Sequence, residues 1–183
     1  MEIKETSIKG LVEIYPKVFK DDRGYFFESY NKKKLEEAGI KEDFLQDNQS
    51  WSAKGVLRGL HFQKDPWAQG KLVRVIKGKV LDVAVDLRQS SPTFGQHLTF
   101  VLDDERNNML YVPPGFAHGF SALEDAIFSY KCTNLYNKES ECGIIWNDAS
   151  LNIDWKVSAP NVSPKDQELK TLKEITEAGD IFK

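Results

Sequence analysis

The chain has 183 residues, a length that suits one domain with a substantial apolar core. Its formal net charge of −3 argues against general binding to nucleic acids or anionic membranes, although a few local cations could still bind a small anion. Residues Met1–Glu5 alternate in charge and lack the apolar core of a signal peptide, and no apolar run approaches the ~20 residues of a membrane span. The two cysteines, Cys132 and Cys142, match no zinc or redox spacing. These features predict a cytoplasmic protein.

The first predicted element is a short helix over Asn31–Ala38, closed by Gly39. The middle of the chain alternates strand-like runs with turns, and Lys77-Gly78 between the first two runs predicts a hairpin. Many short strands separated by turns favour an antiparallel sandwich or barrel. The predicted strands are Lys71–Ile76, Lys79–Leu87, Gln96–Leu102, Met109–Val112 and Ile127–Cys132.

In the second of these strands, apolar residues share one face while Asp82 and Asp86 share the other. That face could meet solvent, a polar barrel interior or the surroundings of a site. A last helix should begin after Ser163, with Pro164 at its first position and Asp166 three residues past the cap. It should run toward Ala178 and stop at Gly179.

The densest chemistry lies between Leu57 and Arg74. His61, one of only three histidines, stands close in sequence to Arg58 and Lys71. A histidine exchanges protons near neutral pH, and cations bind anions or stabilise negative charge as it develops. This combination suits proton abstraction next to a carbonyl on an anionic substrate.

Residues Pro113–His118 fit the Pro-x-Gly-x-x-His element of cupin barrels, in which a turn delivers a histidine into the barrel mouth. Metal-binding cupins supply two further ligands from an earlier His-x-His, but the matching place here reads His61-Phe62-Gln63. A catalytic metal site usually needs three suitable protein ligands, so we expect no metal. On its own, His118 could equally be a hydrogen-bonded histidine beside a turn.

Several segments in order along nearly the whole chain resemble the dTDP-4-dehydrorhamnose 3,5-epimerase family, a branch of the cupins. Trp67 interrupts the family pattern between two of them. The matching segments are Asp22–Glu28, Gln46–Asn48, Leu57–Gln63, Gln69–Val75, Asp82–Arg88, Gly115–Phe120, Gly143–Trp146 and Ser163–Asp166.

The resemblance implies an all-β, cupin-type antiparallel barrel (jelly roll) with short terminal helices, as a single domain over residues 1–183. It implies an isomerase that converts dTDP-4-dehydro-6-deoxy-D-glucose to dTDP-4-dehydro-β-L-rhamnose in dTDP-L-rhamnose synthesis. It also implies a homodimer with no cofactor, no metal, no nucleic-acid partner and no membrane partner.

The same resemblance implies four catalytic roles. His61 would remove the protons that flank the C4 ketone, at C3 and C5, and Asp166 would hold the imidazole and stabilise its cation. Lys71 would stabilise the enolate oxygen. Tyr130 would return a proton from the opposite face, since inversion needs two proton carriers.

A substrate-binding shell is also implied, in which guanidinium and ammonium groups suit the diphosphate. Crossed N-terminal strands would bring Arg23 and Glu28 to the partner's site. The shell comprises Arg23, Glu28, Gln46, Asp47, Asn48, Arg58, Lys71, His118, Glu141 and Lys165.

Plainer interpretations remain for single residues. Arg23 could form a turn ion pair, Asp166 could belong only to a helix cap, Tyr130 could be an ordinary half-buried tyrosine and Lys71 an exposed strand residue. Three rival functions also remain: a single-carbon epimerase or ketoisomerase of another deoxysugar pathway, a metal-dependent cupin, and a non-catalytic sugar-nucleotide-binding barrel.

Overall fold

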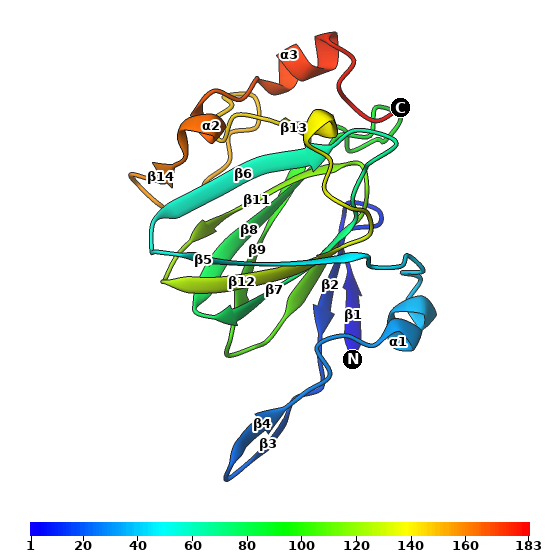
Figure 1. Ribbon diagram of the computed structural model, residues 1–183, viewed down its shortest axis with the longest axis vertical. Helices are drawn as coiled ribbons and strands as arrows, with labels where there is room; N and C mark the ends of the chain where they lie inside the picture. Colours follow the sequence, from blue (N-terminus) through cyan, green and yellow to red (C-terminus); the bar gives the residue numbers. More distant parts are fainter.

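The computed structural model describes residues 1–183, and most of its regular structure is β-strand (Figure 1). One sheet has the spatial order β1 (Glu2–Glu5), β2 (Val12–Tyr15), β10 (Met109–Val112), β7 (Lys71–Lys77), β12 (Ala126–Cys132) and β5 (Gln46–Ser52). The other has the order β13 (Glu141–Gly143), β6 (Val56–Gln63), β11 (Phe116–Ala122), β8 (Lys79–Asp86) and β9 (His97–Asp103). The short β14 (Asn161–Val162) runs parallel to β6, and every other pairing between strands is antiparallel. The predicted all-β, antiparallel fold is confirmed.

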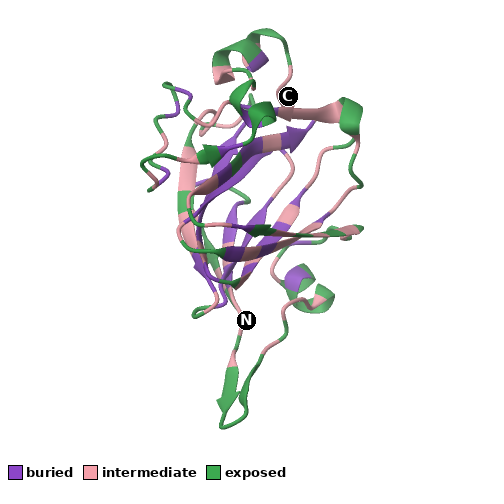
Figure 2. Ribbon diagram, turned by 60° about the vertical axis from the view of Figure 1, so that its left-hand side comes forward, coloured by how far each residue is buried: buried purple, intermediate pink, exposed green.

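The main apolar core lies between the two sheets, which face each other and bury their inner strands (Figure 2). Phe128 from β12 stacks on Phe120 from β11, with ring centroids 4.3 Å apart, and so joins the sheets directly. β-branched and aromatic residues favour such pleated, buried surfaces. The buried residues of this core include Val73, Val75, Val80, Ala84, Leu102, Leu110, Val112, Phe120, Ala126 and Phe128.

Toward one end of the barrel the inner residues change from apolar to polar. On β7 Val75 and Val73 give way to Lys71, and on β12 Phe128 gives way to Tyr130. Because alternate residues of a strand point to the same face, these polar side chains continue the inner rows of the core. The core therefore ends where a polar mouth begins.

The predicted hairpin at Lys77-Gly78 is wrong, although both strands exist. β7 pairs with β10 and β12, whereas β8 pairs with β9 and β11, so the chain crosses from one sheet to the other at Gly78. Gly78 has φ +85°, and a Cβ there would lie 2.1 Å from the carbonyl oxygen of Asp125. Only glycine fits this crossing without displacing the backbone.

The first helix, α1 (Lys32–Glu37), agrees with prediction. The Asn31 side chain accepts a hydrogen bond from the backbone N–H of Lys34 at 3.2 Å, and Gly39 follows the helix with φ +89°.

The predicted C-terminal helix is wrong as one continuous element. It divides into α2 (Pro164–Gln167) and α3 (Leu172–Glu177), while η1 (Lys138–Ser140) is a separate 3-10 turn. The backbone N–H of Ile145 bonds to the carbonyl of Lys170 at 2.8 Å, and Thr171 and Glu174 form a new capping box. Bonding to a distant segment and a second helix start therefore interrupt the helical pattern.

A two-stranded hairpin projects from the body of the molecule (Figure 1). It consists of β3 (Phe19–Asp21) and β4 (Gly24–Phe26), and all six strand residues are exposed. Phe26 is 66% exposed. Tyr25 stacks on Phe27 with ring centroids 6.0 Å apart, but the exposed aromatic rings of this two-stranded element otherwise have little apolar cover within their own chain.

No helix is long and apolar enough to cross a membrane. Both cysteines are free thiols, with Cys132 buried and Cys142 partly buried.

Candidate active site

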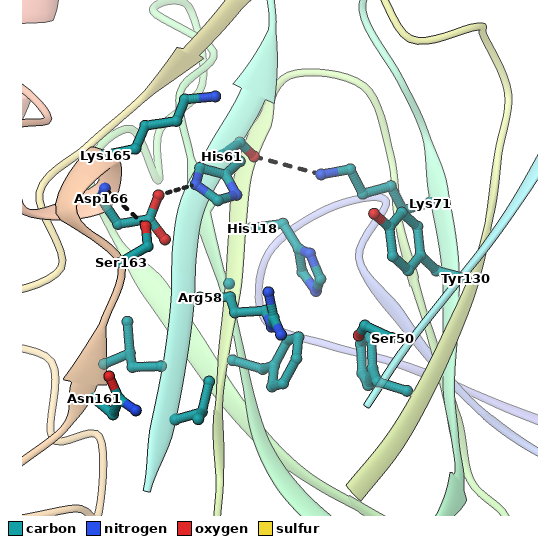
Figure 3. Close-up of a pocket in the computed structure, with 15 residues that line it drawn as sticks. Ser50, Arg58, His61, Lys71, His118, Tyr130, Asn161, Ser163, Lys165 and Asp166 are labelled. Atoms are coloured by element: carbon teal, nitrogen blue, oxygen red, sulfur yellow. Dashed lines mark hydrogen bonds and ion pairs between the residues drawn. The ribbon is translucent and has the colours of Figure 1, made fainter. Parts of the chain in front are cut away.

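Two adjoining cavities occupy the polar mouth of the barrel. The larger, of about 520 Å³, and the smaller, of about 300 Å³, are both bordered by His61, Lys71 and Tyr130. Figure 3 shows these side chains converging from different strands onto one space. Three of the four residues predicted to be catalytic thus stand at the junction of the cavities.

His61 is held by the fourth. Its Nε2 lies 2.7 Å from Oδ1 of Asp166, which comes from α2 on the far side of β6. The carboxylate accepts the proton on Nε2, so the neutral ring carries its lone pair on Nδ1. Nδ1 makes no hydrogen bond within the chain and is free to act as a base toward the cavity.

Asp166 is buried and well supplied with donors. Its second oxygen accepts the backbone N–H of Gly59 at 3.2 Å. Burial acts to raise the pKa of Asp166, but the hydrogen bond from His61, with the donors of Gly59 and Ser163, brings that pKa below its ordinary value. The carboxylate therefore stays ionised and can stabilise an imidazolium ion.

The cap at Ser163 exists as well. Ser163 Oγ accepts the backbone N–H of Asp166 at 3.1 Å. Two different parts of Asp166 serve the helix start and the histidine, so the cap and the histidine partnership occur together.

Tyr130 approaches from the opposite sheet. It projects from β12, and its hydroxyl points across the cavity toward the side of His61 (Figure 3). Burial raises the pKa of Tyr130, so the phenol keeps its proton at neutral pH. An imidazole and a phenol thus reach the same cavities from two sheets.

Lys71 lies beside both. Its Nζ donates to the backbone carbonyl of His61 at 3.5 Å, a long contact that a better acceptor could replace. Burial lowers the pKa of Lys71, against the opposing effect of Cys132, Asp82 and Glu141. Burial thus disfavours the ammonium form of Lys71 in the free chain, and an oxyanion developing in the cavity would favour it.

A second histidine–aspartate pair lies deeper. His118 Nε2 sits 2.9 Å and 3.0 Å from the two carboxylate oxygens of Asp82, and both side chains are buried. Asp82 therefore faces the barrel interior beside a cavity-lining histidine, which excludes solvent among the three options that its sequence position left open. The sequence did not single out Asp82 as the partner of His118, because the pairing joins adjacent strands far apart in the chain.

Some of the predicted binding residues border the cavities or their rim, and others do not. Arg58 crosses from β6 to β5, where its Nε donates to Ser52 Oγ at 3.0 Å, and it lines the larger cavity. Lys165 and Glu141 form an ion pair at 2.6 Å on the rim. Gln46 and Asn48 project inward from β5 and line the smaller cavity.

Three predicted binding residues lie elsewhere in this chain. Asp47 occupies the outer face of β5, because strand residues alternate, and forms an ion pair with Lys131 at 2.8 Å. Arg23 lies at the tip of the projecting hairpin, paired with Asp21, and its side chain is 85% exposed. Glu28 pairs with Lys34 beside α1.

Gln63 occupies the place where metal-binding cupins have a second histidine. Its amide group is hydrogen-bonded to the backbone of Trp67, Leu135 and Asn137. No group of three or more His, Cys, Asp or Glu side chains lies together in a way that could hold a metal ion.

Tyr136 is a site residue that the sequence did not single out. Its exposed ring borders the smaller cavity, and its hydroxyl donates to Glu141 Oε2 at 2.9 Å. The available signal was a pair of bulky residues, Leu135 and Tyr136, in an otherwise polar loop.

The chain has clear relatives. The sequence model of the family described as dTDP-4-dehydrorhamnose 3,5-epimerase matches residues 5–174. The dTDP-4-dehydrorhamnose 3,5-epimerase of Shigella flexneri is 54% identical over 168 residues, which cover 91% of this chain and 93% of the relative.

Solved structures agree. The dTDP-6-deoxy-D-glucose-3,5-epimerase of Legionella pneumophila, in complex with dTDP-4-keto-L-rhamnose, has a TM-score of 0.95 and 47% identity, over 100% of this chain and 97% of that one. A 3'-monoepimerase from Streptomyces bikiniensis, in complex with dTDP-quinovose, has a TM-score of 0.90 and 32% identity, over 96% and 90%.

Proposed function

This chain belongs to the dTDP-4-dehydrorhamnose 3,5-epimerase family, and from that membership we propose that it converts dTDP-4-dehydro-6-deoxy-D-glucose to dTDP-4-dehydro-β-L-rhamnose. It is an isomerase that inverts C3 and C5 of a nucleotide-linked hexose in dTDP-L-rhamnose synthesis. The observation that carries this proposal is the pair of proton carriers, His61 and Tyr130, reaching one cavity from two facing sheets.

We assign the first step to His61. Nδ1 removes the proton from C3 or C5, the C–H electron pair forms a C=C bond to C4, and the C4 oxygen becomes an enolate. Lys71 stabilises that oxygen, and ionised Asp166 stabilises the imidazolium.

Tyr130 completes the inversion in this mechanism. Its O–H donates a proton to the same carbon from the face opposite His61, and the enolate collapses to the ketone. Exchange with solvent then removes the extra proton from His61 and supplies a new proton to Tyr130. A single proton carrier on one face would tend to regenerate the starting configuration.

The nucleotide is proposed to occupy the smaller cavity and the rim. The side-chain amides of Gln46 and Asn48 offer donors and acceptors to a thymine edge, and the exposed ring of Tyr136 offers a stacking surface. Arg58 and Lys165 suit the diphosphate. His118 and Glu141 supply further polar contacts around the sugar and base.

We further propose one domain, a homodimer and a cytoplasmic location. The exposed aromatic hairpin β3–β4 needs a cover, and a partner's barrel would supply one while receiving Arg23 and Glu28. Two free thiols fit a reducing compartment.

The decisive test is NMR of the hexulose turned over in heavy water. Deuterium should enter at C3 and at C5, and the product should have both centres inverted. His61→Ala should abolish uptake at both carbons, because nothing else removes the protons. Tyr130→Phe should keep exchange but lose net inversion, so an equal loss of both would count against the proposed acid.

The same spectra test a second candidate, inversion of a single carbon. It is favoured by the resemblance in fold to a 3'-monoepimerase. Deuterium confined to one carbon, with one inverted centre, would establish that activity in place of the double inversion.

A further inference from the structure

Gln63 is a buried polar residue that the proposed chemistry does not use. It is 4% exposed and follows His61 by two positions on β6. Residues two apart in a strand point to the same side, and both side chains border the smaller cavity. The strand that carries the base therefore carries this carboxamide as well.

Every hydrogen-bonding part of the Gln63 amide is engaged. Nε2 donates to the carbonyl of Trp67 at 2.7 Å and to that of Leu135 at 3.1 Å, while Oε1 accepts the N–H of Asn137 at 2.7 Å. These backbone groups belong to two separate loops, one after β6 and one after β12. One side chain thus ties both loops to β6.

Tyr136 lies between two of the tethered residues. The carbonyl before it and the N–H after it bond to Gln63, and its own N–H donates to Gln46 Oε1 at 2.9 Å. Its ring is 55% exposed beside the smaller cavity. The position of that ring is thus set by hydrogen bonds, both those of the flanking backbone and the one from its hydroxyl to Glu141 Oε2, because apolar packing covers little of it.

We propose that Gln63 is a positioning residue that holds the Tyr136 loop in its binding conformation and thereby sets affinity for the nucleotide. This inference rests on the proposed function in one respect, the nucleotide's place in the smaller cavity. If the loop is already ordered before the nucleotide binds, the binding free energy does not include the conformational-entropy cost of ordering it. Proton transfer occurs at His61 and Tyr130, so Gln63 should affect binding far more than turnover.

The first experiment compares Gln63→Met with the matched control Gln49→Met. Methionine fills the space without donors or acceptors, and Gln49 lies exposed on the outer face of β5. In Gln63→Met, Kd for dTDP should rise by about tenfold, while kcat at saturating substrate stays within about twofold of the parent. Gln49→Met should change neither quantity. A fall in kcat with unchanged Kd would overturn the proposal.

A double-mutant cycle tests whether Gln63 acts through Tyr136. Once Tyr136→Ala has removed the ring, adding Gln63→Met should raise Kd for dTDP no further. If the two changes instead raise Kd for dTDP by independent factors that multiply, Gln63 has another role.

Hydrogen exchange tests the tether without any ligand. The amide of Asn137 should exchange faster in Gln63→Met, while the amides of β6 keep their protection. Unchanged protection at Asn137 would overturn the proposal. If the exchange result holds but dTDP does not bind the parent protein, the tether stands and the proposed function fails.

Gln63→Glu provides a variant of nearly identical shape. Its ionised carboxylate would face the carbonyl oxygens of Trp67 and Leu135 with no proton to donate. Protonation of that carboxylate would restore one hydrogen-bond donor. Relative to the parent protein, its Kd for dTDP should improve as pH falls toward 5. A constant ratio across pH would contradict the hydrogen-bonding role.

Discussion

Asp166 shows how one residue can satisfy a local and a distant requirement together. Its backbone N–H bonds to Ser163 at the start of α2, and its carboxylate bonds to His61 on β6. The capping motif in the sequence and the resemblance to an epimerase each predicted one of these contacts, and each concerns different atoms.

Asp166→Asn should separate the two contributions. Asparagine keeps the backbone contact but loses the charge that stabilises the imidazolium, so kcat should fall by about a hundredfold or more with a small change in Tm. The control is Thr171→Ala, which removes a cap from α3: it should cost about 1 kcal/mol of unfolding free energy and leave kcat near the parent value. Steady-state kinetics and urea unfolding measure both. Normal turnover in Asp166→Asn would reduce Asp166 to a structural residue.

The residues that sequence reasoning missed share one property. Each has a partner that is distant along the chain: Asp82 pairs with His118, Gln63 bonds to the loop after β12, and the backbone of Tyr136 bonds to Gln46. A single sequence shows residue types and spacing, but these partnerships depend on which strands become neighbours. Resemblance to a family supplied His61, Tyr130, Lys71 and Asp166, and the fold brings them together.

The strand pattern was sufficient to locate β7, β8, β9, β10 and β12 but not to pair them. Alternation reveals a strand and a glycine reveals a turn, yet both occur in a hairpin and in a crossing between sheets. Contacts between distant segments decide between the two. The C-terminal helix failed for the same reason, since its break depends on bonding between Ile145 and Lys170.

Gly78→Ala tests the crossing, with Gly55→Ala as its control. Both glycines have nearly the same φ, +85° and +86°, but a Cβ at Gly55 meets nothing within 4 Å. Gly55→Ala should lower the unfolding free energy by about 1 kcal/mol through backbone strain alone. Gly78→Ala adds a collision with the Asp125 carbonyl and should cost at least about 3 kcal/mol. Equal losses in urea unfolding would show that the crossing tolerates a side chain.

The free energy of unfolding should depend on pH through Asp86, the last residue of β8. Asp86 is fully buried; burial acts to raise its pKa, but hydrogen bonds from Arg88, Ser91 and Thr93 bring the pKa to about 2, from an ordinary 3.8. Because the folded pKa is the lower one, the stabilisation is complete above about pH 4 and is lost as pH falls toward 2.

This loss should amount to roughly 2 kcal/mol. Urea unfolding between pH 5 and pH 2 measures it. Asp86→Asn should be less stable at pH 6 but show a shallower decline with acid. Parallel curves for the two proteins would exclude Asp86 as the source.

In the whole molecule, the projecting hairpin leads us to expect active sites that combine residues of two chains. Arg23 lies on that hairpin, apart from the cavities of its own chain, and the proposed dimer places it in the partner's cavity. Arg23→Ala and His61→Ala should each be inactive as pure proteins. In a mixed dimer, one site would combine an intact His61 with an intact Arg23.

Co-refolding equal amounts of the two variants should therefore restore about a quarter of the parent activity, as random pairing in a two-fold dimer predicts. Sedimentation should show dimers in every sample. Dimers that regain no activity would place Arg23 outside the shared site.

The two-chambered mouth has one more consequence. In the proposed mechanism a lone imidazole serves carbons on either side of the ketone, so the pyranose would have to rotate between the two events while its nucleotide stays bound. The larger of the two chambers that border this imidazole, of about 520 Å³, would be the place for that rotation. A socket moulded tightly to one sugar pose would halt the reaction after a single centre, and narrowing the chamber is thus a direct route from a double to a single stereochemical change.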